Sequence, residues 1–249
     1  MRAITLLTDF GTSDYFVGAM KGVILSINPQ AVIVDITHEI PAQDVAAGAW
    51  QLLAAYDVFP EGTIHVAVVD PGVGSERRPI VVRAGNYLFV GPDNGIFSYI
   101  YDRNPSFEAF HITAAEHFHH PVSNTFHGRD IFAPVAAALS TGIDPSSLGP
   151  PIDDPIQLFN SAEPRIIHID HFGNLITNIT RDQFQEGMRL AVNGHVISHF
   201  RRFYGENVGD EPFAIWGSAG FLEIAVNGHS AADLLGAKRG ASVALNNSL

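Results

Sequence analysis

The order of segments along the first hundred residues constrains the fold of this chain more than any other feature of its sequence. An apolar run typical of a buried strand covers 3–8, two further strand-like runs cover 31–36 and 63–69, and helical patterns lie between them at 15–27 and 44–58. The helical patterns repeat apolar residues every three or four positions, as one buried face of a helix requires. Because a helix between two strands lets them pair in parallel, this order predicts an α/β domain with a mostly parallel sheet.

Later segments extend this domain and then change in character. A hairpin-like pair of strands is followed by two helical patterns, the second at 130–140. Residues 148–155 are rich in Pro and Asp, which is typical of a linker. Beyond them the chain has short strand-like runs and a hairpin signal at Asn193-Gly194, which predict a small β-barrel or sandwich. We therefore expect an α/β domain at 1–150, a linker at 151–163 and a β-barrel domain at 164–249.

Composition excludes several classes of function. The 249 residues carry a formal net charge of -12, so the chain lacks the basic footprint of a nucleic-acid-binding protein. Cysteine is absent, which excludes disulfides, thiolate catalysis and zinc sites built on cysteine. The apolar run at 4–7 is too short for a signal peptide or a membrane span. We expect a cytoplasmic protein with neither a membrane nor a nucleic-acid partner.

Three acidic residues stand where predicted strands end, and such ends are where parallel sheets bind ligands. They are Asp9, Asp35 and Asp70. Gly11 follows Asp9, and Gly72 and Gly74 follow Asp70, so both loops let the backbone approach a ligand closely. A single Asp at a strand end caps or shapes a turn about as often as it binds a ligand.

The loop at 69–78 combines glycines with charged side chains. It contains neither a P-loop nor a dinucleotide fingerprint. Asp70 and Arg77 stand seven positions apart, and a loop that folds back on itself can bring them together. Spacing alone favours an ordinary surface ion pair, which contributes little to stability or function.

Histidine occurs 12 times, and two groups are candidates for chemistry. His117, His119 and His120 lack the i,i+4 spacing of a helical zinc pair, so we interpret them as a polar loop and expect no metal site. His127 precedes the helix at 130–140. The partial positive charge of a helix N-terminus favours a neutral imidazole and an anion or hydroxide-like water beside it. A lone histidine is, however, more often a local hydrogen-bonding residue.

The remaining polar and aromatic candidates have plain structural alternatives. Asn174 follows a predicted strand and could read the edge of a base, whereas Asn227-Gly228 is the usual composition of a hairpin turn. Phe126 and Phe172 could stack on an aromatic ligand, but phenylalanine is more often a core residue. From the residues alone, the sequence indicates an α/β domain, a β domain and a set of polar loops, without a defined reaction.

Six segments taken together resemble the S-adenosylmethionine (SAM) hydroxide adenosyltransferase family, which is related to fluorinase and chlorinase. Each is weak alone, but the ordered set spans nearly the whole chain. The segments are Leu7–Gly11, Val69–Gly74, Gly91–Gly95, Thr125–Asp130, Phe172–Asn174 and Gly217–Ile224. The resemblance implies an α/β domain, a C-terminal β-barrel and a homotrimer that binds substrate between subunits.

The resemblance also implies roles for individual residues. Asp70, Arg77 and His127 would handle a nucleophilic water that attacks the ribose C5′ of SAM. The residues that it places around the substrate are Asp9 at the ribose diol, Asn174 and Asn227 with the backbone near Val226 and Gly228 at the nucleoside, Phe126 and Phe172 as pocket walls, and Ser218 and Glu223 at the methionine end.

The expected activity is hydrolysis of SAM to adenosine and methionine, with no cofactor and no metal. The halide-using relatives place tyrosine where Asp70 stands and carry an extra loop in the first domain. Fluorinase also has serine where Gly128 stands. Since this sequence departs from all three features, water is favoured over halide as the nucleophile. Two alternatives stay open: a halide-using adenosyltransferase of the same fold, and a non-catalytic protein that binds adenosine or SAM.

Overall fold

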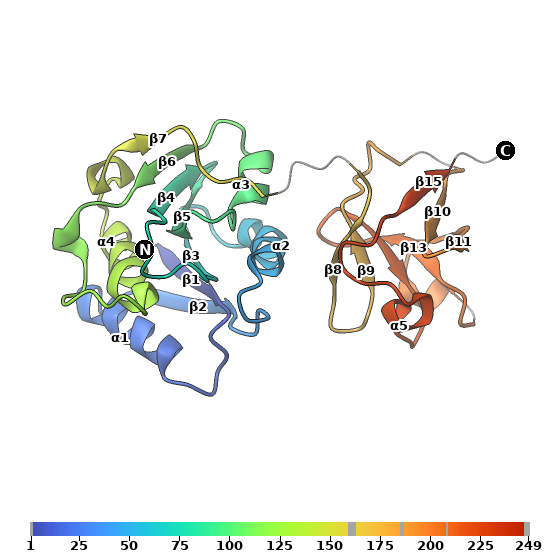
Figure 1. Ribbon diagram of the computed structural model, residues 1–249, viewed down its shortest axis with the longest axis horizontal. Helices are drawn as coiled ribbons and strands as arrows, with labels where there is room; N and C mark the ends of the chain where they lie inside the picture. Colours follow the sequence, from blue (N-terminus) through green and yellow to red (C-terminus); the bar gives the residue numbers. More distant parts are fainter. Residues whose placement is uncertain (1, 159–162, 185–186, 208, 247–249) are drawn as a thin grey trace. The chain divides into compact units, whose positions relative to one another are not determined.

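The computed structural model describes residues 2–158, 163–184, 187–207 and 209–246. The chain divides into two compact units, Met1–Asn160 and Ser161–Leu249 (Figure 1). Each unit has its own buried apolar core. Within the described residues, no helix is both long and apolar enough to cross a membrane.

The first unit is built on a mixed sheet of seven strands, which confirms the expected α/β domain. Four neighbouring strands pair in parallel, and the antiparallel part begins at the hairpin of β5 and β4. In spatial order the strands are β2 (Val32–Thr37), β1 (Ala3–Thr8), β3 (Ile64–Val68), β5 (Tyr87–Pro92), β4 (Pro79–Ala84), β6 (Glu108–His111) and β7 (Pro151–Ile152). The first three strands in the sequence match the expected strands to within about one residue at each end, although Val32 and Val34 of β2 are exposed.

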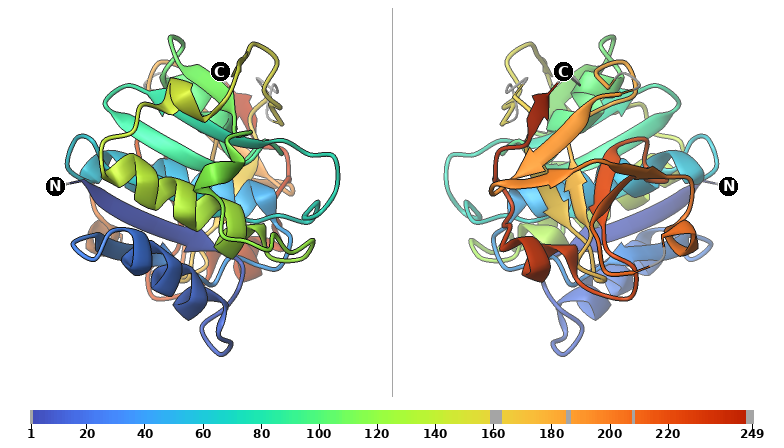
Figure 2. Two further views of the ribbon diagram at one scale, coloured as in Figure 1. Left: turned by 90° about the vertical axis from the view of Figure 1, so that its left-hand side faces the viewer. Right: turned by 90° about the vertical axis from the view of Figure 1, so that its right-hand side faces the viewer.

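Helices cover both faces of this sheet (Figure 2). One face carries α1 (Phe16–Ile27) and α4 (Ala133–Ser140), and the other carries α2 (Val45–Ala55) and α3 (Ser98–Arg103). The buried stripe of α1 is Val17, Met20 and Ile24, which shows the three-to-four-residue spacing of one helix face. A π-helical turn, Gly128–Phe132, runs directly into α4. Short 3₁₀ turns occur at Tyr56–Val58, Ala115–His117 and Pro145–Leu148.

The segment expected as a linker packs on the first unit over its first half. Ile152 of β7 pairs with Ala109 of β6. The Ile156 amide donates to Asp93 Oδ1 at 2.8 Å, and the Leu158 amide donates to Ser98 Oγ at 3.0 Å. Residues 159–162 of the expected linker lie outside the described residues.

The second unit is β-rich, and its described residues form two sheets that both contribute side chains to a main apolar core. One sheet has the order β11-β10-β15 and the other β12-β13-β14-β9-β8. The strands are β8 (Ile166–Ile169), β9 (Leu175–Thr177), β10 (Arg189–Val192), β11 (His195–Ile197), β12 (His199–Arg201), β13 (Phe213–Trp216), β14 (Leu222–Ala225) and β15 (Ala244–Asn246), with α5 (Ala231–Leu235) and a 3₁₀ turn at Tyr204–Glu206. Asn193-Gly194 forms the expected turn between β10 and β11.

Candidate active site

Three loops of the first unit begin at the same edge of the sheet. Strand β3 lies between β1 and β5 and is parallel to both, with Val68 paired to Thr8 and Val66 paired to Val90. The loops that follow these strands therefore leave the sheet side by side, at the carboxyl edge where open α/β sheets bind ligands. The loop after β1 carries Asp9, the loop after β3 contains residues 70–77 and is called the Asp70–Arg77 loop, and the loop after β5 carries Asn94.

The Asp70–Arg77 loop folds back so that its two ends form a buried ion pair. Arg77 Nε donates to Asp70 Oδ1 and Oδ2 at 2.9 and 3.0 Å, and Arg77 Nη2 also donates to Asp70 Oδ2. The two side chains are only 5% and 9% exposed. The prediction of an ordinary surface ion pair, which the spacing alone favoured, is therefore wrong. A pair removed from water is costly to break, because either charge left alone would stay buried without its partner.

Close backbone packing explains the shape of this loop. Ser75 Oγ donates to the Gly72 carbonyl at 2.6 Å and accepts from the Arg77 amide at 3.3 Å, so one hydroxyl closes the turn. Gly74 adopts a positive φ of 79°, and a Cβ there would collide with the Asn124 carbonyl. Glycine is therefore required at this position both by conformation and by the neighbouring chain.

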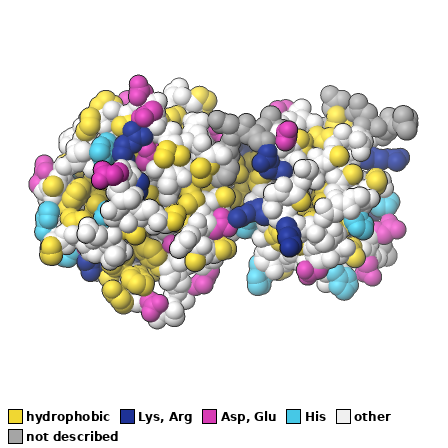
Figure 3. Space-filling model, viewed as in Figure 1, with side chains coloured by type: hydrophobic (Ala, Val, Ile, Leu, Met, Phe, Trp, Pro, Cys, Tyr) yellow, Lys and Arg dark blue, Asp and Glu magenta, His cyan; other side chains and the backbone are white. Residues whose placement is uncertain are grey.

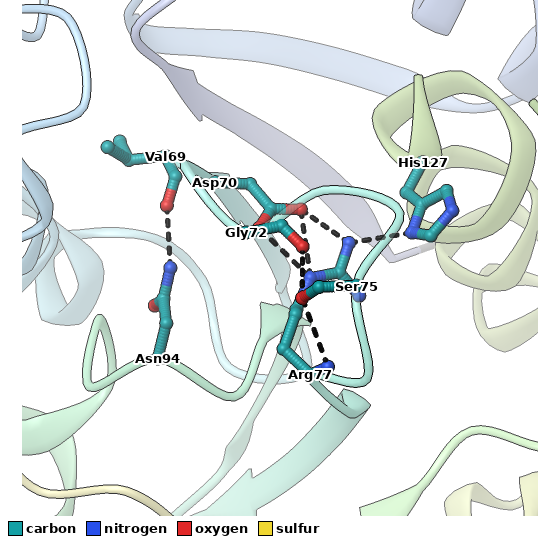
Figure 4. Close-up of polar contacts among 7 residues, drawn as sticks. All are labelled: Val69, Asp70, Gly72, Ser75, Arg77, Asn94 and His127. Atoms are coloured by element: carbon teal, nitrogen blue, oxygen red, sulfur yellow. Dashed lines mark hydrogen bonds and ion pairs between the residues drawn. The ribbon is translucent and has the colours of Figure 1, made fainter. Parts of the chain in front are cut away.

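His127 completes a triad with Asp70 and Arg77 (Figure 4). Arg77 Nη2 lies 2.7 Å from His127 Nδ1. Since a guanidinium carries only donors and stays protonated, Nδ1 must accept this hydrogen bond, and the imidazole proton must lie on Nε2. Burial and the positive charge of Arg77 lower the pKa of His127, although Asp70 and Asp130 act in the opposite direction. The triad therefore holds a neutral imidazole of fixed tautomer.

One guanidinium nitrogen of Arg77, Nη1, takes no part in the hydrogen bonds of the triad. Nη1 is buried and has no hydrogen-bond partner among the described residues. The guanidinium stands over the ring of Phe132, 5.2 Å from its centroid, which supports the group without satisfying its donors. An unsatisfied buried donor on a cation is a site for an anion or a polarised water oxygen.

Asp9 is held by the loop that follows β2. Its Oδ2 accepts from the Gln43 amide at 2.7 Å, and Gln43 has a positive φ of 66°. The Gly11 amide donates to the His38 carbonyl at 2.8 Å, which ties the loop after β1 to the same segment. Asp9 Oδ1 accepts from no described residue, so it keeps capacity for a ligand hydroxyl.

Asp35, the third acid at a strand end, is engaged by the side chains of Lys21 and His38. Its Oδ2 lies 2.6 Å from Lys21 Nζ, and its Oδ1 lies 3.1 Å from His38 Nε2. Burial raises the pKa of Asp35, but the hydrogen bonds and charges of these two partners outweigh it and lower the pKa overall. Asp35 therefore forms a structural ion pair with Lys21.

The second unit contains an open pocket of about 560 Å³ that gathers several of the expected substrate residues. Five of its lining residues were expected from the sequence, namely Phe172, Asn174, Val226, Asn227 and Gly228. Tyr204 also lines it and was missed, because it stands in a short loop whose sequence carries no ligand-binding pattern. The Phe172 side chain at its edge is 74% exposed.

The loop at 170–174 lines this pocket and is held together by the carboxylate of Asp170. Asp170 Oδ1 accepts from the amides of Phe172 and Asn174, both at 2.9 Å, and Asp170 Oδ2 accepts from Asn174 Nδ2 at 2.8 Å. One N–H of the Asn174 amide is thereby used, and its Oδ1 accepts from no described residue. Gly173 has a positive φ of 82° and packs so tightly on Ser230 that a side chain would collide.

Asn227 and Gly228 form a turn after β14, which confirms the structural alternative considered for them. Val226 and His229 are bridged across it, and Gly228 has a positive φ of 73°. Asn227 Nδ2 donates to the Asn207 carbonyl at 3.0 Å. The turn itself lines the pocket, so a structural role and a place at the ligand site coincide here.

Glu223 and Ser218 occupy different environments. Glu223 is 9% exposed, its Oε2 accepts from Tyr204 Oη at 3.0 Å, and its carboxyl group packs against Gly217. Burial raises the pKa of Glu223; the Tyr204 hydrogen bond opposes this and the charge of Asp170 adds to it. Ser218 is exposed in the loop that joins β13 and β14.

Phe126 lies in a buried aromatic cluster. It is 6% exposed, and its ring centroid is 5.1 Å from that of Phe16 and 5.8 Å from that of Phe10. Its packing is that of a core residue, in contrast to the exposed Phe172.

The other histidines of interest make local contacts. His120 Nε2 lies 3.0 Å from the Ala115 carbonyl oxygen, and the His119 amide donates to the Asp130 carbonyl. Across the part of the chain that the structure describes, no three His, Asp or Glu side chains gather in a way that could hold a metal ion.

These features define a two-unit protein with a buried polar triad on an α/β unit and an open pocket on a β-rich unit. Residues 4–149 match the SAM hydroxide adenosyltransferase N-terminal domain, and residues 164–244 match the C-terminal domain of the same family. The chain therefore belongs to the SAM hydroxide adenosyltransferase family, which confirms the resemblance seen in its motifs.

Individual relatives agree with this assignment. The chain is 39% identical to an (R)-S-adenosyl-L-methionine hydrolase of Thermus thermophilus, over 98% of this chain and 100% of the relative. It is 26% identical to a fluorinase of Nocardia brasiliensis, over 96% and 95% of the two chains. A crystal structure of a conserved protein from Thermotoga maritima superimposes with a TM-score of 0.91 at 35% identity, covering 98% of this chain and 100% of that one.

Proposed function

We propose that this chain hydrolyses S-adenosyl-L-methionine to adenosine and L-methionine. The observation that carries the proposal is the convergence of Asp70, Arg77 and His127, with Arg77 Nη1 left to bind one further oxygen. Its support from relatives is that (R)-S-adenosyl-L-methionine hydrolases match most of the chain at 35–44% identity.

The reaction needs help at the nucleophile rather than at the leaving group. A water oxygen forms a bond to ribose C5′ while the C5′–S bond breaks, and its electron pair returns to sulfur. A positively charged sulfonium thereby becomes the neutral thioether of methionine, so no acid is required there. Water itself is a poor nucleophile, with a pKa of about 15.7. A buried guanidinium donor that stabilises hydroxide-like charge addresses this difficulty directly.

The fixed tautomer of His127 limits where the proton of this water can go. Nδ1 already accepts a hydrogen bond from Arg77, and Nε2 carries the imidazole proton. His127 is thus set up to donate from Nε2 and to hold Arg77 in place. Asp70 is an ionised acceptor with lone pairs beyond those that Arg77 occupies. We therefore assign to Asp70 the orientation of the water and the acceptance of its proton.

We assign substrate recognition to the remaining polar groups. The free Oδ1 of Asn174 matches an exocyclic amine such as that of adenine, and the rings of Phe172 and Tyr204 offer flat surfaces for the base. Asp9 Oδ1 suits a ribose hydroxyl. Glu223 and Ser218 are assigned to the methionine end. Phe126 lies in the core of the first unit, and we assign it the support of the substrate site on that unit.

Halide use is the second candidate, and the buried carboxylate argues against it. A halide ion in reach of C5′ and Arg77 would also face Asp70, which is 5% exposed and poorly screened by solvent. Water can hydrogen-bond to that carboxylate, whereas a halide ion is repelled by it.

A product analysis tests the proposal. Purified protein is incubated with SAM, with SAM plus chloride or fluoride, and with SAM plus EDTA, and the products are separated by chromatography. The proposal predicts adenosine and methionine in every arm, since Arg77 rather than a metal supplies the positive charge. A 5′-halo nucleoside would support the halide-using alternative, and saturable SAM binding without products would support a non-catalytic binding protein.

Four finer expectations stay predictions: closure of the second unit into a barrel, the boundaries 1–150, 151–163 and 164–249, a homotrimer with substrate between subunits, and a cytoplasmic location.

A further inference from the structure

The segment Gly91–Gly95 has no role in the proposed chemistry, yet it contacts both ends of the Asp70–Arg77 loop. Asn94 Nδ2 donates to the Val69 carbonyl at 2.8 Å, immediately before Asp70. Asp93 Oδ2 accepts from Arg78 Nε at 2.9 Å and Nη2 at 2.6 Å, immediately after Arg77. The loop is thus held at the residue before it and at the residue after it.

Sheet topology explains why these contacts exist. β5 is the parallel neighbour of β3, so the residues after β5 emerge beside those after β3. The Asp93 amide donates to the Arg78 carbonyl at 2.9 Å, so backbone and side chain secure the same residue. Asp93 is 2% exposed and Val69 is fully buried, so water does not compete for these contacts.

Asn94 is itself fixed. Its Oδ1 accepts from the Ile96 amide at 3.3 Å, which leaves the Nδ2 group directed at Val69. Figure 4 shows Asn94 on one side of the Asp70–Arg77 loop and His127 on the other. Asp70 is the residue that follows the anchored Val69 carbonyl. A shift of the backbone at Val69 would therefore move the Asp70 carboxylate relative to Arg77.

We propose that Asn94, with Asp93 as the second anchor, is a positioning residue for Asp70, Arg77 and His127. It fixes the start of the Asp70–Arg77 loop so that the triad meets the attacking water in the reactive geometry. The inference rests on the proposed hydrolysis and adds a residue to it. A displacement of about 1 Å can cost a factor of about 100 in rate, because the reacting atoms must be aligned.

The test compares Asn94→Asp with Asn104→Asp. Asn94→Asp keeps the shape and the acceptor to Ile96 but removes the donor to Val69. Asn104 is a matched control, because its Nδ2 donates to the Ile100 carbonyl at 3.0 Å at the far end of α3. Asn94→Ala is made in parallel, in case a carboxylate beside the Val69 carbonyl prevents folding.

We expect kcat of both Asn94 variants to fall by about 10- to 100-fold, with the Kd for SAM within twofold of the wild type. Asn104→Asp should keep kcat within twofold. If kcat is unchanged in the Asn94 variants, or falls equally in the control, the proposal is wrong.

A second readout does not depend on turnover. ¹⁵N NMR of the imidazoles, with the His127 signal identified by its loss in His127→Asn, reports the His127 tautomer. The Asn94 variants should lose the Nε2–H preference, because Arg77 no longer donates steadily to Nδ1. An unaltered His127 spectrum in these variants overturns the positioning role. If the wild-type protein releases no adenosine, the proposed hydrolysis fails, and this spectrum still decides the role of Asn94.

Discussion

The triad of the first unit and the pocket of the second unit differ in how completely their polar groups are satisfied. Asp70, Arg77 and His127 are joined by direct hydrogen bonds inside a buried loop, with one donor to spare. The pocket is open, its aromatic wall Phe172 is 74% exposed, and Asn174 offers an acceptor with no described partner. The first arrangement is preorganised for chemistry, whereas the second needs a ligand to complete it.

Their surroundings differ as well. The visible face of the first unit carries scattered acidic side chains and few basic ones (Figure 3), in keeping with the net charge of -12. The positive charge that matters for the proposed reaction is therefore local and buried. If this contrast is correct, changes in the triad should affect turnover, and changes in the pocket should affect binding.

The largest effect is expected from Asp70→Asn. The amide keeps the size of the side chain but removes the charge that orients water and accepts its proton, so kcat should fall by about 10²- to 10⁴-fold. SAM binding, measured by calorimetry, should change little. Near-normal adenosine release by this variant would contradict the role assigned to Asp70.

Arg77→Lys should follow. An ammonium group cannot contact Asp70, His127 and a water oxygen at once, because it lacks the planar fork of the guanidinium. We expect kcat to fall by about 100-fold, as when one donor to a developing negative charge is removed. The measurement is single-turnover release of adenosine, and a fully active lysine variant would show that the spare Nη1 donor is not used.

Phe172→Ala and Phe126→Ala compare the loss of an exposed ring in the second unit with the loss of a buried ring in the first unit. Loss of the exposed Phe172 ring should weaken SAM binding by about 1–3 kcal/mol, since stacking on a base is lost, and leave stability unchanged. Loss of the buried Phe126 ring should reduce the free energy of unfolding by about 3–5 kcal/mol. Equal effects of both variants on stability would remove this distinction.

The last prediction concerns acid stability and leaves turnover aside: a pH dependence of stability arises in the first unit. Burial lowers the pKa of His65 to about 3, and burial with Arg77 lowers the pKa of His127. Below pH 6.5 the unfolded chain binds protons that the folded chain does not, so stability is lost as pH falls from 6.5 toward 3. One such group contributes at most about 1.4 kcal/mol per pH unit.

Urea unfolding at several pH values checks this dependence. His65→Gln should flatten the acid slope relative to the wild type. If the two slopes are the same, the buried His65 does not contribute to the acid response.

The sequence predicted the elements that carry their own pattern. β1, α1 and β3 show clear periodicity and clear ends, and their bounds follow closely. β7 has two residues and exists because Ile152 pairs with β6, so no local pattern could indicate it. α5 did carry a signal that was missed: Ser230 caps it by accepting from the Asp233 amide at 3.1 Å.

The sequence likewise predicted some features of the candidate site and not others. Spacing allowed Asp70 and Arg77 to meet, but the loop between them also packs at Gly74 against Asn124, a contact between distant segments that spacing could not indicate. Tyr204 reaches the pocket only through the fold of the second unit, and its hydrogen bond to Glu223 spans 19 positions. Resemblance to a family supplied the roles of these residues, since local pattern could not.

Hydrolysis in H₂¹⁸O tests most directly whether the triad delivers water to C5′. The account predicts that adenosine carries one ¹⁸O atom at its 5′-hydroxyl and that methionine carries none, with the labelled product strongly reduced in Asp70→Asn. Adenosine without the label, or label in a product of cleavage on the methionine side of sulfur, would contradict it.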